Sequence, residues 1–284
     1  MLGPDDLVLC AGTVMGSSFR ERVEAAAAAG YRGITLWAMD YRAARDDGLS
    51  AADMRAMLAD NGLAIGELDG VSSWLPAGPG VAAAAMAERE AAGLVIPERV
   101  FWEVADELGG RSLNVFELFG DAVDTEVAAE AFAGLCDRAG EHGLLVHIEP
   151  LPWSGIGDVH AAAAITRLAG RANGGVLLDT WHHFRAGLDA AALTPEVAAH
   201  VNGIQISDAP ALAESDPMDE CSHRRLLPGE GAADVAGVLR ALRAGGVDAP
   251  VGVEVFSDAL REPGMSSAAA RAAEAARAVV DAAR

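Results

Sequence analysis

The sequence predicts a single (β/α)₈ barrel, and three observations support this prediction. Short segments rich in Val, Ile and Leu alternate with longer Ala-, Leu-, Glu- and Arg-rich segments eight times along the chain. Alternating strands and helices imply a parallel sheet, and 284 residues suit one closed barrel of eight units. No linker, charge block or change in composition divides the chain, so residues 1–284 are expected to form one domain.

The eight expected strands are nearly continuous apolar runs, which is typical of strands buried on both faces. A helix is expected after each strand, and glycines such as Gly30 and Gly62 mark helix ends. Residues 70–80 are rich in Gly and Pro and are expected to be irregular, and residues 208–231 are expected to form a long loop. The strands are expected to start at Leu7, Arg32, Leu63, Ser112, Leu144, Gly175, Val201 and Pro250.

Composition and charge limit the classes of function. The chain carries 42 acidic and 21 basic residues, and this net charge of -21 makes nucleic acid a poor partner. No run reaches the roughly 18 apolar residues of a membrane-spanning helix, so no membrane association is expected. Three cysteines without CxxC spacing, and no leader pattern, indicate reduced thiols in the cytoplasm. The expected partner is a small-molecule substrate, and homo-oligomer formation stays open.

Four consecutive strands each end in an oxygen-bearing side chain. Because strand residues alternate and the inward set meets at the barrel mouth, Glu149, Asp179, Gln205 and Glu254 are expected to converge. Three carboxylates in an apolar barrel would repel one another without a cation. We therefore expect a divalent metal on these four residues, Mn²⁺ or Mg²⁺ because the ligands are oxygens, with Co²⁺ or Zn²⁺ as alternatives. The competing interpretation is that each acid pairs with a local arginine or caps a helix.

Tryptophans gather where the strands end. Trp37, Trp74, Trp153 and Trp181 all fall at or just after a strand C-terminus, which places them at the mouth. Aromatic faces stack on sugar C–H surfaces or on planar rings, so this rim predicts a ring-bearing substrate. Alternatively, each tryptophan plugs the top of the barrel.

Three further polar residues are assigned to substrate binding. His147 shares a strand face with Glu149, and Arg185 follows the sixth strand, where it can reach a substrate oxygen or carboxylate. Arg225 precedes the segment LPGEG and is expected either to clamp an anionic group or to form a local salt bridge. The Glu between the glycines of LPGEG argues against a phosphate cradle, so a neutral substrate is favoured over a phosphorylated one.

At these residues the chain resembles the xylose-isomerase-like barrel superfamily, which includes sugar epimerases, ketose isomerases, dehydroshikimate dehydratases and nucleases of the endonuclease IV type. The family pattern is Glu on strand five, Asp followed three residues later by His on strand six, His on strand seven and Glu on strand eight. Glu149, Asp179 with His182, and Glu254 match it, and Gln205 stands where most epimerases carry His. The resemblance covers nearly the whole barrel and is strongest in HIEPLPWSGIGD, GGVLLDTWHHFRAG, VNGIQISDAP, RRLLPGEG and VGVEVFS.

The resemblance implies enediolate chemistry. In the epimerases and isomerases both glutamates ligate the metal and transfer protons, roles that would fall to Glu149 and Glu254, while His182 would contact a substrate oxygen. The first expectation is therefore a metal-dependent isomerase or epimerase acting on a sugar, cyclitol or related hydroxy-carbonyl compound. The alternatives are a lyase or dehydratase that uses the same enolate and a non-catalytic binding barrel. A nuclease would need a basic groove and more than the seven histidines present.

Overall fold

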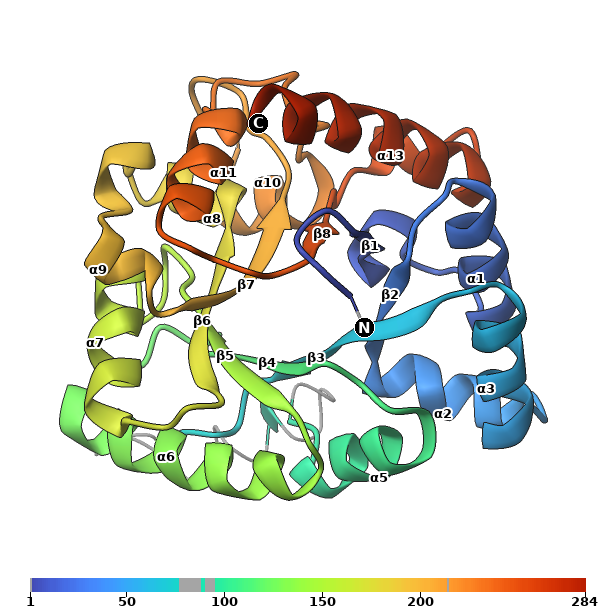
Figure 1. The fold of residues 1–284 in the computed structure, drawn as a ribbon, viewed down its shortest axis with the longest axis horizontal. Helices are drawn as coiled ribbons and strands as arrows, with labels where there is room; N and C mark the ends of the chain where they lie inside the picture. Colours follow the sequence, from blue (N-terminus) through green and yellow to red (C-terminus); the bar gives the residue numbers. More distant parts are fainter. Residues whose placement is uncertain (1, 77–87, 90–94, 214) are drawn as a thin grey trace.

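The computed structural model describes residues 2–76, 88–89, 95–213 and 215–284. Eight parallel strands pair in sequence order and close into a barrel through the pairing of β1 with β8, which confirms the (β/α)₈ prediction (Figure 1). Each strand begins within one residue of its expected start. The strands are β1 (Leu7–Leu9), β2 (Gly33–Trp37), β3 (Ala64–Val71), β4 (Ser112–Phe116), β5 (Leu145–Glu149), β6 (Gly174–Asp179), β7 (Val201–Ile206) and β8 (Val251–Val253).

Helices form a ring around the barrel (Figure 1). Ser18 and Ser50 start two of them through reciprocal capping boxes, and left-handed Gly170 ends a third. In the described part of the chain, no helix is long and apolar enough to cross a membrane. The ring contains α1 (Phe19–Ala28), α2 (Ala38–Asp46), α3 (Ala51–Asp60), α5 (Glu98–Leu108), α6 (Thr125–Glu141), α7 (Val159–Ala169), α9 (Pro195–Ala198), α11 (Val235–Ala244) and α13 (Met265–Ala282).

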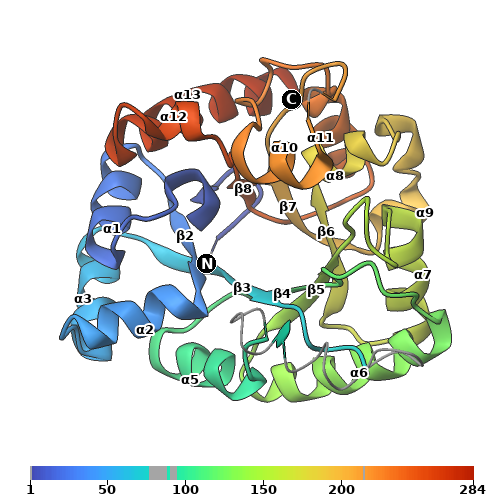
Figure 2. The same ribbon diagram turned by 180° about the vertical axis from the view of Figure 1, so that it is seen from behind.

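Short helices lie in the connections that follow β1, β6, β7 and β8. They are η1 (Ala11–Val14), α8 (Thr180–Arg185), η2 (Ala190–Ala192), α10 (Pro217–His223) and α12 (Asp258–Arg261). Figure 2 views the molecule from behind and shows α10 in front of β7 and β8. Beneath α10, Trp181, Ala209 and Cys221 form a small apolar cluster, separate from the main core between strands and helices.

Two expectations about connections need correction. β3 continues to Val71, into the segment 70–80 that was expected to be irregular, and residues 77–80 lie outside the described residues. Residues 208–231 are not a plain loop, because Asp216 caps the N-terminus of α10 by accepting a hydrogen bond from the Met218 amide.

Candidate active site

A cavity of about 300 Å³ opens where the strands end. Its walls are mainly apolar, and its polar side chains come from the ends of β3, β5 and β8, from α8, and from α10 and the segment after it. The polar and charged lining residues are Asp69, Ser72, Glu149, His182, Ser222, Arg225 and Glu254, and the apolar ones include Trp37, Ile96, Phe116, Leu118, Leu151, Trp153, Met218 and Phe256.

The turn from β6 into α8 positions His182. Asp179 is the last residue of β6 and also caps α8, because its Oδ1 accepts a hydrogen bond from the His182 amide at 3.0 Å. The Asp-x-x-His spacing is therefore a helix cap, which fixes the imidazole next to the strand that supplies the carboxylate. Glu149, Asp179 and His182 each place one candidate ligand atom within 4.8 Å of the others.

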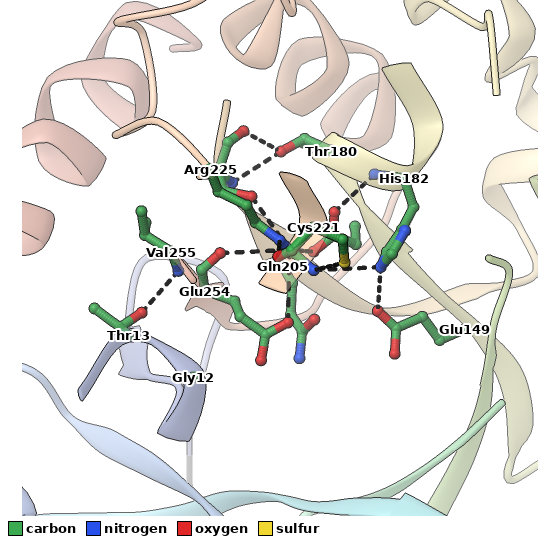
Figure 3. A network of polar contacts seen from close by, with 12 residues as sticks. Gly12, Thr13, Glu149, Thr180, His182, Gln205, Cys221, Arg225, Glu254 and Val255 are labelled. Carbon is green, nitrogen blue, oxygen red and sulfur yellow. Dashed lines mark hydrogen bonds and ion pairs between the residues drawn. The ribbon is translucent and has the colours of Figure 1, made fainter. Parts of the chain in front are cut away.

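Glu149 is held between an amide and an imidazole. Asn114 on β4 donates to Glu149 Oε2 at 2.7 Å. His182 Nε2 lies 3.4 Å from Glu149 Oε1, as Figure 3 shows. The same Asn114 nitrogen also donates to Asp69 Oδ1 at 3.0 Å. Asp69 receives a second hydrogen bond from Trp37 Nε1 at 3.0 Å, so Asn114 and Trp37 order the acidic edge of the cavity.

Arg225 is the central cation of the site and is 2% exposed. Its Nη1 donates to Asp179 Oδ2 at 2.7 Å and lies 3.7 Å from Glu254 Oε2. Its Nε donates to the Cys221 carbonyl at 2.9 Å, which ties the guanidinium to α10. Figure 3 shows Arg225 between Glu254 and His182. The arginine offsets part of the negative charge that the sequence placed at the mouth, but one guanidinium does not balance three carboxylates.

Burial raises the pKa values of the buried acids, and the positive charge of Arg225 lowers those of Glu254 and Asp179. Burial raises the pKa of Asp69 to about 8, and the charges of Glu67 and Glu149 add to the shift. Burial also raises the pKa of Glu254 well above its ordinary value, although Arg225 opposes it. For Asp179 burial acts in the same upward direction, but the charges of Arg225 and His182 and the hydrogen bonds lower its pKa overall. The cavity therefore contains carboxyl groups that differ in their readiness to hold a proton.

Gln205 is buried on β7 and is not among the residues that line the cavity. Its Nε2 donates to Glu67 Oε1 at 2.9 Å, and its Oε1 is buried without a hydrogen-bond partner. Because the Glu67 carboxylate accepts but does not donate, the amide nitrogen must face Glu67 and the oxygen is left for another group. In Figure 3 the Gln205 nitrogen points away from Arg225. Asp179 and Gln205 are direct neighbours in the β6–β7 register, as the strand-end argument requires.

These donors fit a divalent cation. The buried Gln205 oxygen lacks a partner, and Glu149, Asp179 and Glu254 supply more negative charge than Arg225 neutralises. An all-oxygen set with a histidine nearby suits a hard divalent ion. The arginine pairing proposed as the competing interpretation is also present, at Asp179 and Glu254, so the two interpretations are not exclusive.

Of the residues expected to bind substrate, some line the cavity and others are bound to acidic side chains of the protein interior. Trp37, Trp153 and Arg225 line the cavity. Trp181 is fully buried and donates to Glu220, and Arg185 donates to the same carboxylate at 2.7 Å.

His147 is also absent from the cavity lining. Its Nε2 lies 2.5 Å from Glu67 Oε2, inside the barrel, and Gly203 leaves room for its ring, since a Cβ there would stand 2.6 Å from the imidazole. The assignments of His147, Trp181 and Arg185 to substrate binding therefore need correction, because a neighbouring acid occupies each polar group.

Three polar residues on β3 and β4 hydrogen-bond within the site but were not among the expected site residues: Glu67, Asp69 and Asn114. Their signal was present, because Glu67 and Asp69 are two residues apart in the apolar run LAIGELDGV and so share a strand face. Asn114 interrupts SLNVF in the same way, as a buried polar residue that needs a partner.

Comparison with known proteins supports the family resemblance. Two curated 3-dehydroshikimate dehydratases are similar to the chain. The Pseudomonas aeruginosa protein is 30% identical over 250 residues, covering 87% of this chain and 37% of that protein. The Pseudomonas putida protein is 28% identical over 252 residues with the same shares. The chain thus spans little more than a third of the length of the curated relatives it matches.

Solved structures share the fold over nearly the whole chain. A xylose isomerase-like TIM barrel/4-hydroxyphenylpyruvate dioxygenase fusion protein superposes with a TM-score of 0.82 at 25% identity, covering 99% of this chain and 44% of that chain. The IOLI protein with a bound zinc atom gives 0.80 at 18% identity, covering 97% and 98%. A family model described as xylose isomerase-like TIM barrel matches residues 23–281. The chain therefore belongs to the xylose isomerase-like TIM barrel family.

Proposed function

We propose that this site catalyses a metal-dependent elimination of water from a cyclic hydroxy-carbonyl compound. The observation that carries the proposal is the convergence of Glu149, Asp179 and His182 within 4.8 Å at an apolar cavity. The curated relatives are 3-dehydroshikimate dehydratases, which favours the lyase alternative over the isomerase or epimerase that the sequence pattern placed first.

Glu149, Asp179, Gln205 and Glu254 would hold the metal, with Mn²⁺ or Mg²⁺ as the proposed ion because the donors are oxygens. When bound there, the ion supplies Lewis-acid polarisation of the substrate's carbonyl oxygen. The chain's own residues orient the substrate and move protons.

Elimination needs a base at the carbon next to the carbonyl and an acid at the departing hydroxyl. Glu149 would remove the carbon proton, and the contacts of its carboxylate support this role, because Asn114 holds one oxygen and the other faces His182. Protonated His182 can give its proton to the hydroxyl, which then leaves as water while the carbon–carbon double bond forms. Glu149 has gained one proton and His182 has lost one, so transfer across their 3.4 Å contact restores both groups.

The cavity walls serve the same reaction by excluding water. Trp37 stacks on Phe256 with ring centroids 6.3 Å apart, and Trp153 packs edge-on against His182 at 5.5 Å. These rings limit solvent access to the Glu149–His182 contact and offer apolar faces to a ring-shaped substrate.

The test compares product chemistry in D₂O, using Mn²⁺-loaded protein with 3-dehydroshikimate and uncharged cyclic hydroxy-ketones. A lyase releases water and produces a conjugated carbonyl absorbance. Glu149→Gln keeps an oxygen ligand but removes the base, so turnover should fall about 10²- to 10⁴-fold with metal retained. Glu196→Gln, whose side chain is 80% exposed, is the matched control and should behave as the wild type. Wild-type rates in Glu149→Gln would contradict the proposal.

An isomerase or epimerase is the second candidate, favoured by one observation: Glu149 and Glu254 both line the cavity. Two carboxylates at one cavity allow removal of a proton by one and return by the other. This function predicts solvent deuterium in a product of unchanged composition, with no water released. Mass spectrometry of the product in D₂O distinguishes the two functions.

A further inference from the structure

His182 lines a second, much smaller cavity in addition to the active-site cavity. This small cavity has a volume of about 10 Å³, which is the room that a single water molecule needs. It lies at the start of α7 and α8, and its polar lining residues are Asp158, Asp179, His182 and His183. The reaction proposed above uses Asp179 and His182, but it gives no role to Asp158 or His183.

One ring nitrogen of each of the two histidines lacks a partner. Nε2 of His182 lies 3.4 Å from both Glu149 and Arg225, and in Figure 3 every dashed contact of the ring starts from this nitrogen. Nδ1 of His182 and Nδ1 of His183 are buried without a hydrogen-bond partner among the described residues. A buried polar atom that lacks a partner is destabilising. Two such atoms, in residues that line one water-sized cavity, indicate that a bound water bridges them.

The backbone determines which nitrogen of His183 carries the proton. Nε2 of His183 lies 2.9 Å from the carbonyl oxygen of Asp189, which can only accept, so Nε2 is the donor. Burial lowers the pKa of His183, which favours the neutral ring. Nδ1 of the neutral ring is therefore an acceptor, and a water in the small cavity must donate to it.

Asp158 supplies a second acceptor for such a water. Its Oδ1 caps α7 by accepting hydrogen bonds from the His160 and Ala161 amides at 2.9 Å, and its Oδ2 remains available. A carboxylate accepts hydrogen bonds and does not donate them. A water that gives one proton to His183 and the other to Asp158 has only lone pairs left for His182. Nδ1 of His182 must then carry a proton.

We infer that one water molecule binds in the small cavity and holds His182 in the tautomer protonated at Nδ1, with His183 as a positioning residue. Nε2 of His182 is then the ring nitrogen that exchanges a proton with the substrate and with Glu149. This role in proton transfer rests on the proposed function, whereas the water site and the tautomer do not. His183 and Asp158 do not line the active-site cavity and act through the water.

Two substitutions of His183 separate the roles of its two ring nitrogens. His183→Gln places an amide nitrogen near the position of Nε2, so the bond to the Asp189 carbonyl can form, but no atom stands in the place of Nδ1. His183→Asn does the reverse, because its Oδ1 stands near the position of Nδ1 and its shorter side chain does not reach Asp189. His183→Asn is therefore the matched control, which loses the structural hydrogen bond and keeps the water.

The first measurement needs neither metal nor substrate. Proton–nitrogen NMR spectra of protein labelled with nitrogen-15 in histidine, recorded in EDTA, show which ring nitrogen of neutral His182 is protonated; its signals are those lost in His182→Gln. The wild type and His183→Asn should show a protonated Nδ1, and His183→Gln should populate the Nε2 tautomer. A high-resolution crystal structure of the wild type should contain a water within hydrogen-bonding distance of both Nδ1 atoms. A wild type protonated at Nε2, or no water between the rings, would overturn the inference.

A third substitution tests the direction of the hydrogen bonds. Asp158→Asn keeps an oxygen for the α7 cap and replaces the other oxygen by an NH₂ group, which donates to the water. The water then has a proton left for His182, so the ring should shift towards the Nε2 tautomer. An unchanged tautomer would overturn the assignment of Asp158 as the second acceptor.

Kinetics test the role in proton transfer separately. With Mn²⁺-loaded protein and 3-dehydroshikimate, His183→Gln should lower kcat roughly 10- to 100-fold with KM nearly unchanged, the range typical of a lost partner that orients a ring. His183→Asn should keep kcat near the wild-type value although its Tm falls. Equal losses of kcat in both variants would contradict the positioning role. A wild type that does not dehydrate the probe would contradict the proposed function, and the NMR spectra would still decide the inference.

Discussion

Glu67→Gln tests whether a residue outside the cavity sets the metal affinity by orienting Gln205. Glu67 uses one oxygen for the Gln205 nitrogen at 2.9 Å and the other for His147 Nε2 at 2.5 Å. A glutamine at position 67 keeps the volume but has a single acceptor oxygen, so it cannot satisfy both donors. Its NH₂ group would instead donate to Gln205 Oε1, which turns the Gln205 nitrogen toward the metal site.

The magnitude follows from the hydrogen bond that is lost. A bond to a charged acceptor contributes about 1.5–3 kcal/mol, and about 1.4 kcal/mol corresponds to a tenfold change in an equilibrium constant. Mn²⁺ should therefore bind roughly 10- to 100-fold more weakly, the range typical of lost contacts to a ligand residue. His147 can retain the remaining acceptor, so the fold should survive.

Calorimetric titration with Mn²⁺ measures the affinity, and urea unfolding in EDTA measures stability independently of the metal. Glu196→Gln, on the exposed surface, removes the same charge and is the matched control. Unchanged Mn²⁺ affinity in Glu67→Gln, with the fold intact, would refute the reasoning that Glu67 holds the Gln205 oxygen in place for the ion.

The remaining predictions concern the cavity and its charges. Trp37→Ala should raise KM with little loss of Tm, because Trp37 lines the cavity. Trp181 is fully buried, so Trp181→Ala should lower the free energy of unfolding in urea by about 3–5 kcal/mol. The reverse pattern would contradict the placement of both rings. Asp69, whose pKa is raised to about 8, binds its proton more tightly in the folded state, so its stability contribution is present in acid and is lost as pH rises toward 8. Asp69→Asn should remove up to about 1.4 kcal/mol per pH unit of that slope in EDTA, and an unaltered slope would count against it. Arg225→Met should destabilise the metal-free protein by about 3–5 kcal/mol, because Asp179 and Glu254 lose their cation. Mn²⁺ should then raise its Tm more than that of the wild type, and equal shifts would show that arginine and metal do not share these carboxylates.

The barrel itself could be predicted from local pattern. Each strand is a short apolar run, six of the eight follow a helix-ending glycine, and the alternation of strand and helix leaves few topologies. The approach of Glu149 to Asp179 within 4.8 Å could be predicted for a related reason, while the full set with Gln205 and Glu254 stays a prediction. Barrel closure brings the C-terminal ends of all strands together, so knowing that a residue ends a strand is enough to place it near the mouth.

Contacts between segments far apart in the sequence could not be predicted from local sequence pattern. Arg225 meets Asp179 across 46 residues, and Gln205 meets Glu67 across 138. The sequence put Arg225 near the mouth but could not choose between an anionic substrate and an acid of the chain. That choice depends on where the packing of α10 positions Arg225, whose Nε donates to the Cys221 carbonyl of that helix. Periodicity in the sequence does not determine this packing.

Sequence alone thus determined the fold class, the position of each strand and the four oxygen-bearing strand ends, because all of these follow from the two-residue period of strands and the closure of the barrel. Only the tertiary structure decided that Trp181 and Arg185 belong to the packing around Glu220, that His147 and Gln205 share Glu67, and that one buried arginine is the cation of the cavity. Those outcomes depend on which polar groups the folded chain brings within hydrogen-bonding distance of one another. In a buried site every charge must find a partner, and the partners come from strands and loops far apart in the chain.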